Sequence, residues 1–179
     1  MTARYVPAHT TPSSNRRLML CSRPSAHPQG DDLQLEKSAR PTISAGEVLV
    51  RSIYLSADPV QRGWAAVQPL GTVMRGLAVG VIVESLRAEF TEGDLVFGTF
   101  GWQDYCVPVE GDILSHVTNP VLPASAYAGV LGMPGVTAWL ALRSIAPPQM
   151  GQRVLVSTAA GAVGSVVGQL VSRAGALPY

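Results

Sequence analysis

One stretch near the C-terminus decides the fold of this chain: VLVSTAAGAVGSVVGQLVSRAGALPY, residues 154–179. Its first four residues, Val154–Ser157, form a short apolar and β-branched run of the kind found in buried parallel strands. A turn of small residues follows, and apolar residues then recur with helical spacing from Ala162 to about Ala174. A strand, a glycine-containing turn and a helix in this order are typical of a dinucleotide-binding βα unit.

The small residues of this turn carry the chemical argument. Ala159, Gly161 and Gly164 occupy the glycine positions of the G-x-G-x-x-G pattern, so the first glycine is replaced. Gly161 would let the backbone approach a pyrophosphate, and Gly164 would let the helix pack closely against the strand. The helix N-terminus would supply amide donors and partial positive charge. Small residues also pack ordinary helices on sheets, so the turn by itself leaves both interpretations open.

The sequence after the turn lacks the rest of a cofactor domain. A charged residue that reads the adenosine ribose should stand about 20 residues further on, but the only ionisable side chains after Gly161 are Arg173 and Tyr179. Five apolar residues of the helix also need a surface to pack against: Val163, Val166, Val167, Leu170 and Val171. We therefore expect a truncated or frame-altered product with no strands flanking 153–157, in which LPY replaces the second strand.

The N-terminal two thirds of the chain predict an all-β domain. From Arg17 to about Val121, short apolar runs alternate with Gly, Pro and Asp, which favours a small β-barrel or sandwich. The runs are RLMLC (17–21), EVLVRSIYL (47–55), AVGVIVES (78–85), DLVFGTF (94–100) and DYCVPV (104–109). Residues 1–16 are polar and predict a flexible lead-in.

A change of composition near Leu122 marks the end of this domain. Ala, Leu and Met then dominate with helical spacing, which predicts helices at about 124–132 and 135–145, broken at Met133–Pro134. The predicted organisation is a lead-in (1–16), a β-barrel domain (17–122), and hinge helices with the first βα unit of an incomplete Rossmann domain (123–179). The fold class is α/β with an all-β N-terminal part.

Charge and composition argue against several classes of partner. Thirteen basic and twelve acidic residues give a formal charge of +1, and only one of the basic residues is Lys. No segment concentrates this charge, so we expect no nucleic acid partner. The two cysteines form no CxxC pair, and we expect neither a disulfide framework nor a metal site. We also expect no secretory signal, no membrane span and a cytoplasmic location.

Six segments in a fixed order resemble one family, the zinc-independent medium-chain dehydrogenase/reductases. They are most similar to its prostaglandin reductases, alkenal double-bond reductases and curcumin reductases. The segments are NRRLML (15–20) with SRP (22–24), YLSADPVQRG (54–63), VMRGLAVGVIVES (73–85), GDLVFGTFGWQDY (93–105), LGMPGVTAWLAL (131–142) and VLVSTAAGAVGSVVGQL (154–170).

This resemblance implies a GroES-like β-barrel followed by a Rossmann domain, with the active site between them. It also implies hydride transfer from NADPH to the β-carbon of an α,β-unsaturated ketone or aldehyde, without a metal. Hydrogen-bond donors must then stabilise the carbonyl oxygen as it becomes negative. The family is about twice as long as this chain, in line with the expected truncation.

The resemblance also assigns residues. The family's pyrophosphate turn is matched by Thr158, Gly161, Ala162, Val163 and Gly164. The family's stretch beside the nicotinamide is matched by Met133, Pro134, Gly135 and Thr137. The edge of its active-site cleft is matched by Asp58 and Arg62. The chain departs from the family at four positions. Val60 replaces an aromatic residue near the substrate, Gln61 replaces Met, Thr158 stands at a usual Ala, and Leu77 at a common Gly.

No catalytic residue is assigned, and Arg62 and Tyr54 are the candidates. Core packing is the simpler role for Tyr54, and an ion pair with Asp58 is an equal alternative for Arg62. Other residues are expected to be structural. Trp102, Tyr105 and Trp139 are predicted to pack in cores, Cys106 to be a small buried residue, and Asp31–Asp32 to form a solvated turn.

Two classes of function remain open. The first is an alkene reductase, impaired in this chain, with a zinc-independent quinone reductase as an alternative in the same class. The second is a non-catalytic GroES-like remnant or binding module, which forms a homo-oligomer or pairs with a full-length relative.

Overall fold

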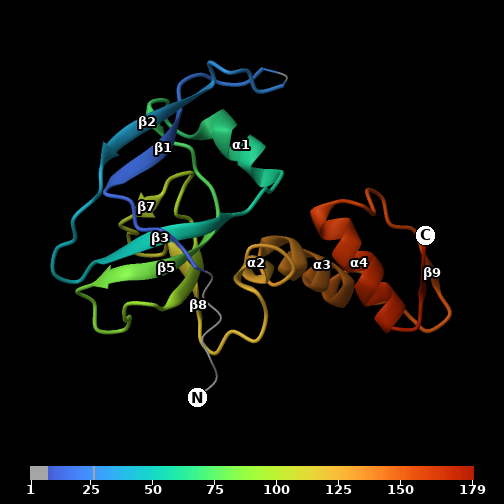
Figure 1. The fold of residues 1–179 in the computed structure, drawn as a ribbon. Helices are drawn as coiled ribbons and strands as arrows, with labels where there is room; N and C mark the ends of the chain where they lie inside the picture. The colour runs from blue at the N-terminus through green and yellow to red at the C-terminus, as the bar shows by residue number, and fades with distance from the viewer. Residues whose placement is uncertain (1–7, 26) are drawn as a thin grey trace. The chain divides into compact units, whose positions relative to one another are not determined.

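A computed structural model describes residues 8–25 and 27–179 of the chain. It divides into two compact units, Met1–Ser125 and Ala126–Tyr179, called here the first and the second unit. In Figure 1 the first runs from blue to yellow and the second from orange to red. The described part of the chain has no helix that is long and apolar enough to cross a membrane.

The first unit is built from two antiparallel sheets (Figure 1). The larger has the strand order β7-β3-β5-β6-β8 and the smaller the order β2-β1-β4. The strands of the larger sheet are β3 (Val48–Leu55), β5 (Ala78–Ser85), β6 (Leu95–Gly98), β7 (Tyr105–Cys106) and β8 (Ile113–Val117); those of the smaller are β1 (Ser14–Leu20), β2 (Leu33–Ala39) and β4 (Thr72–Val73). The all-β N-terminal part is confirmed. Strands β2 and β8 were not predicted, because most of their side chains are exposed.

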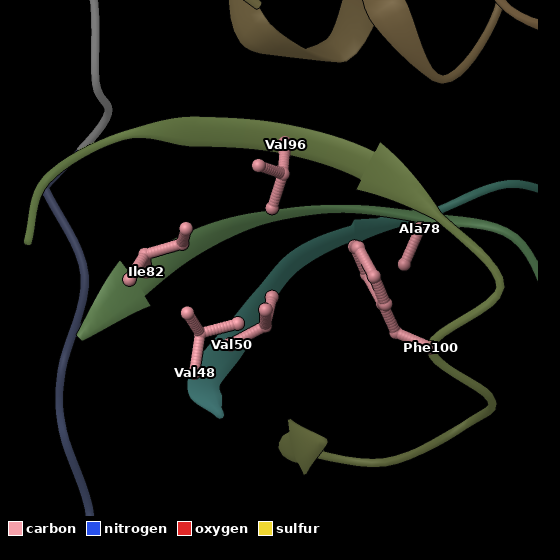
Figure 2. Packing of buried hydrophobic residues seen from close by; sticks show 6 residues of the cluster. All are labelled: Val48, Val50, Ala78, Ile82, Val96 and Phe100. Carbon is pink, nitrogen blue, oxygen red and sulfur yellow. The ribbon is translucent and has the colours of Figure 1, made fainter. Parts of the chain in front are cut away.

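The main core of this unit lies on β3, β5 and β6, and each apolar run predicted for these strands is confirmed. Figure 2 shows the side chains of six core residues: Val48, Val50, Ala78, Ile82, Val96 and Phe100. Each is at most 1% exposed. Burial of one large apolar side chain contributes about 1.5–3 kcal/mol, so this cluster alone rivals the net stability of a small domain.

The predicted lead-in ends earlier than expected, because Ser14, Asn15 and Arg16 already belong to β1. The Asn15 side chain is buried and forms a strand-like pair with the Tyr105 backbone. Its Nδ2 donates to the Tyr105 carbonyl at 3.0 Å, and its Oδ1 accepts the Tyr105 N–H at 2.9 Å. These bonds hold the start of β1 in the barrel. Residues 1–7 of the predicted lead-in lie outside the described residues.

A short helix that was not predicted, α1 (Val60–Val67), follows β3. It begins directly after Pro59, whose ring fixes φ near the helical value and removes an N–H that a helix start leaves unpaired anyway. At its other end Arg23 donates to the carbonyls of Ala65 at 2.9 Å and Gln68 at 3.1 Å. This capping by a residue distant in sequence has no local signal.

The second unit contains two helices that pack together, α3 (Met133–Ser144) and α4 (Ala162–Arg173). The prediction for α4 is confirmed. Helix α2 (Ala124–Tyr127) is shorter than predicted and spans the boundary between the units. The prediction that Met133–Pro134 breaks a helix is wrong, since Pro134 stands in the first turn of α3. Proline is favoured there because the amide it lacks has no helical partner.

A two-stranded parallel sheet completes the second unit. It pairs β9 (Arg153–Val154) with β10 (Leu177–Pro178). Hydrogen bonds extend the pairing, from Leu177 N–H to the Gln152 carbonyl at 2.8 Å and from Val156 N–H to the Tyr179 carbonyl at 2.7 Å. The expectation that no strand flanks 153–157 is therefore wrong, because LPY itself forms the neighbouring strand. Parallel pairing across a helix is the geometry of a βαβ unit.

Candidate functional site

The glycine turn connects β9 to α4 and leaves the start of that helix open. Gly161 is the N-cap residue in an extended conformation, and no side chain caps the helix. The first helical bond runs from Ser165 N–H to the Gly161 carbonyl at 2.9 Å. The amides of Ala162, Val163 and Gly164 therefore have no acceptor within the helix. With the helix dipole behind them, they form a site that favours an anion.

Both glycines of the turn approach Thr158 closely. A Cβ atom on Gly164 would lie 2.3 Å from the Thr158 carbonyl oxygen, and one on Gly161 would lie 3.1 Å from Thr158 Cγ2. The Gly161 N–H also donates to the Thr158 carbonyl at 2.8 Å. Gly164 thus allows α4 to begin tightly against its own turn.

Thr158 adopts an unusual backbone conformation, with φ at 53°. A β-branched residue is a conformational outlier there, at a cost of about 1–2 kcal/mol. Its side chain is exposed, so burial does not offset this cost. Strain of this kind concentrates at functional turns.

An open cavity of about 720 Å³ lies beside the turn. Its walls come from the turn, from one side of α4 and from the end of β10, and include Ala159, Gly164, Ser165, Gly168 and Tyr179. The turn is therefore accessible and is not covered by side chains. Of the three residues with free amides, Gly164 lines this cavity, and Ala162 and Val163 are exposed.

The residues predicted beside the nicotinamide lie at the start of α3, in the same unit. Met133 is its first residue, and the Thr137 hydroxyl donates to the Met133 carbonyl at 2.7 Å. A Cβ on Gly135 would lie 1.7 Å from the Val130 carbonyl oxygen, so only glycine fits at this position. Thr137 itself is exposed. Met133, Pro134 and Thr137 therefore share one helix start.

The other sequence-predicted residues lie in the first unit, around the loop from β3 to α1. Tyr54 is 39% exposed, so the prediction that it packs in the core is wrong. A register shift between Ser52 and Tyr54 against β5 explains the difference, because a bulge interrupts the alternation of inward and outward side chains. The Tyr54 hydroxyl is thereby available as a hydrogen-bond donor.

Asp58 is buried, 8% exposed, and its Oδ2 has no hydrogen-bond partner. Gln61 holds the loop that carries it: its Nε2 donates to the Ser56 carbonyl at 2.5 Å, and its N–H donates to the Asp58 carbonyl at 3.1 Å. Sequence reasoning treated Gln61 only as a substitution for Met. Its role follows from this contact within the loop and from its burial, 7% exposed, which only the coordinates show.

The expected solvated turn at Asp31–Asp32 is half wrong. Asp31 is exposed, but Asp32 is buried and accepts the Gln29 N–H at 2.7 Å and the Ser22 hydroxyl. These hydrogen bonds lower the pKa of Asp32 despite its burial, and the positive charge of Arg62 lowers it further. Arg62 is exposed, and its charge acts on this loop.

Three further predictions concern packing. Tyr105 is fully buried and Trp102 packs partly buried against Leu20 and Met74, which confirms both as core residues. Burial raises the pKa of the Cys106 thiol to about 12, with the Asp112 charge adding to the effect; Cys106 was predicted to be buried and is partly buried, packed against the main core. Trp139 is 46% exposed and stacks with Arg143, so its assignment to a core is wrong.

The chain matches the model of one protein family, described as the N-terminal domain of oxidoreductase, over residues 16–117. This match covers more than half of the chain. The chain belongs to the zinc-independent medium-chain dehydrogenase/reductases. The predicted family and the predicted fold class, a GroES-like barrel followed by the start of a nucleotide-binding domain, are thereby confirmed.

Individual relatives agree with this assignment. The chain is 39% identical over 163 residues to the NADPH-dependent curcumin reductase of Escherichia coli, covering 87% of this chain and 47% of that protein. It is 38% identical over 152 residues to prostaglandin reductase 1 of Bos taurus, covering 83% and 46%. Crystal structures of CurA from Vibrio vulnificus, one of them in complex with NADPH, share 38% identity with TM-scores of 0.83 and 0.80. They cover 92% and 91% of this chain and 50% of their own. The chain thus spans about half the length of these relatives.

Proposed function

We propose that this chain provides the barrel domain (17–122) and the dinucleotide turn, within 123–179, of an NADPH-dependent reductase. Its substrates would be α,β-unsaturated ketones and aldehydes, reduced at the C=C bond. The turn at 158–164 carries the proposal, because no side chain caps the helix that follows it and an open cavity lies beside it. Support comes from relatives named as NADPH-dependent curcumin reductase and prostaglandin reductase 1.

The residues present fit this cofactor. The amides of Ala162, Val163 and Gly164 would hold the diphosphate, and the close approach at Gly164 leaves no room for a larger residue. Thr158 would shape the turn from its inner side. Met133, Pro134 and Thr137, at the start of α3, would bind the nicotinamide end. When bound, NADPH supplies the hydride that adds to the β-carbon of the substrate.

The chain's own side chains would then handle the charge that develops on the substrate. The carbonyl oxygen gains negative charge as the double bond is reduced, and a donor placed there stabilises the transition state. Arg62 and the exposed Tyr54 hydroxyl are the two candidate donors. Gln61 would fix the loop between them through its bond to the Ser56 carbonyl.

Binding and turnover can be measured separately on the 179-residue chain. Calorimetry with NADPH reports binding, and loss of NADPH absorbance with nonenal reports reduction of an enal. We expect weak binding and no turnover, because the dinucleotide part of this chain consists of one turn, two helices and a two-stranded sheet. Rapid turnover would contradict the expected impairment. Absence of binding at millimolar NADPH would contradict the proposed role of the turn.

A non-catalytic binding module is the second candidate function. The large apolar side chains that the second unit leaves exposed favour it, including Leu155 at 86% and Trp139 at 46%. Such a surface suits a partner, either a second copy or a full-length relative. Sedimentation of the chain alone and with a full-length curcumin reductase tests this role. A chain that stays monomeric in both experiments would exclude it.

A further inference from the structure

A groove of about 320 Å³ lies on the first unit, and none of its residues belongs to the glycine turn. Half of its lining residues are apolar, and they come from three strands and the segment before β7. Leu18 of β1 and Leu35 of β2 are register partners across the smaller sheet. Leu35 is 67% exposed and Leu55 is 48% exposed. The apolar lining is Leu18, Leu35, Ile53, Leu55 and Trp102.

The groove has more positive than negative charge, because two arginines and one aspartate line it. Asp104 accepts hydrogen bonds from Arg16 Nε at 2.8 Å and Arg16 Nη2 at 3.1 Å, and Arg51 Nη1 lies 3.1 Å from its Oδ1. One carboxylate therefore serves two guanidinium groups, which leaves one positive charge. The side chain of Arg16 is 63% exposed, whereas those of Arg51 and Asp104 are 12% and 9% exposed. The excess charge is accessible from solvent at Arg16.

The neutral polar groups of the groove are of two kinds: some are engaged in hydrogen bonds, whereas Ser52 Oγ and Trp102 Nε1 are buried without a partner. Gln103 Nε2 donates to the Phe100 carbonyl at 2.8 Å, and its Oε1 accepts from Asn15 at 3.3 Å. The main-chain carbonyl of Ser52 accepts from Arg51 at 2.7 Å. Because these two unpaired atoms are buried, what the groove exposes to a ligand is apolar surface and one positive charge.

We propose that this groove binds a small organic anion with an apolar body, such as a short-chain carboxylic acid. The tail would cover Leu18, Leu35 and Leu55, and the carboxylate would pair with the solvent-facing guanidinium of Arg16. The excess positive charge of the groove would repel a cation, and a neutral molecule would leave that charge unpaired. The groove holds about ten water volumes of ~30 Å³ each, which suits a small molecule. The inference does not depend on the proposed reductase function.

Ligands that differ only in their head group test the charge. Octanoate, octanol and octylammonium can be titrated into the full chain while the indole N–H resonance of Trp102, assigned with Trp102→Phe, is followed by NMR. We expect a saturable shift with octanoate and at least about tenfold weaker binding of octylammonium, with the octanoate affinity falling as salt is added. Equal binding of all three ligands, or shifts that never saturate, would overturn the proposal.

Surface variants test the location. Leu35→Ser should weaken octanoate binding roughly fivefold by removing apolar contact area, with little effect on folding because Leu35 is exposed. Arg16→Gln should weaken it by a similar factor, and Arg16→Lys should restore most of the affinity. Val109→Ser is the matched control, since Val109 is 71% exposed and does not line the groove. An effect of Val109→Ser as large as that of Leu35→Ser would place the ligand elsewhere.

Discussion

In the first unit the fully buried side chains are large, and include Tyr105, Phe100, Leu20 and Leu49. In the second unit the only residue of this group is Val171, and the other buried positions of its helices are small, such as Gly135, Ala138 and Gly164. Sheets of five and three strands give the first unit faces to cover, whereas two strands of two residues give the second very little. Burial in this chain thus follows the number of packed layers more than the hydrophobicity of the sequence.

The same substitution, Leu→Ala, should lower the free energy of unfolding strongly in the first unit and hardly at all in the second. Leu49→Ala removes a fully buried side chain of β3 and should lower the free energy of unfolding by about 2–5 kcal/mol. Leu155→Ala removes a side chain that is 86% exposed and should change it by less than about 0.5 kcal/mol. Urea denaturation of both variants measures the difference. Similar losses would show that Leu155 is covered in solution.

The next largest effect on stability is expected from removing the acidic partner of an ion pair in the first unit. Asp104→Asn should cost about 2–3 kcal/mol, because it leaves Arg51, whose side chain is only 12% exposed, without its carboxylate. The control, Glu36→Gln, removes the exposed pair with Arg17 and should cost at most about 1 kcal/mol. Urea midpoints of both variants at neutral pH provide the test. A cost for Glu36→Gln equal to that for Asp104→Asn would contradict the role of burial.

The pH dependence of this pair has a definite sign. Burial raises the pKa of Asp104, but hydrogen bonds from Arg16 and the charges of Arg51 and Arg16 outweigh it, so the pKa lies below the ordinary value. The pair therefore contributes fully above the unfolded pKa of about 3.9 and is lost as pH falls through the lower folded pKa. The stability difference between wild type and Asp104→Asn should shrink below about pH 4. A constant difference would contradict this linkage.

Alanine substitutions at two glycines of α4 distinguish the effect of close packing on stability from the effect of helix propensity. Gly164→Ala places a methyl group 2.3 Å from the Thr158 carbonyl oxygen and should destabilise the unit by about 1–3 kcal/mol. Gly168→Ala meets no atom within 4 Å and should stabilise α4 by up to about 1 kcal/mol. Thermal unfolding followed by circular dichroism distinguishes the two signs. Equal effects would show that the turn is looser than described.

The smallest predicted effect concerns Cys106. Its pKa of about 12 follows from burial, and a thiol reacts through its thiolate. Iodoacetamide at about pH 8 should leave Cys106 unmodified in the folded chain and modify it after unfolding in urea. Peptide mass spectrometry locates the label. Rapid modification of the folded chain would show that β7 opens easily.

Local sequence signals predicted the parts of the fold that depend on nearby residues. The spacing from Ala162 onward predicted α4, and the apolar runs predicted β3 and β5. The misses share a non-local cause. Tyr54 is exposed by a bulge against β5, and Trp139 lacks a covering layer. LPY pairs with β9, although no strand was expected beside 153–157. At the site the sequence located the glycine turn, but the strain at Thr158 and the loop held by Gln61 needed coordinates.

We propose above all that the backbone amides of Ala162, Val163 and Gly164 bind a diphosphate. Proton–nitrogen correlation spectra of the full chain, recorded as NADPH is added, test it most directly. The account predicts progressive shifts of Gly161, Ala162, Val163 and Gly164 that are reproduced by inorganic pyrophosphate and lost in Gly164→Ala, with the β3 and β5 amides unchanged. Shifts spread evenly over the chain, or none at the turn at millimolar NADPH, would contradict it.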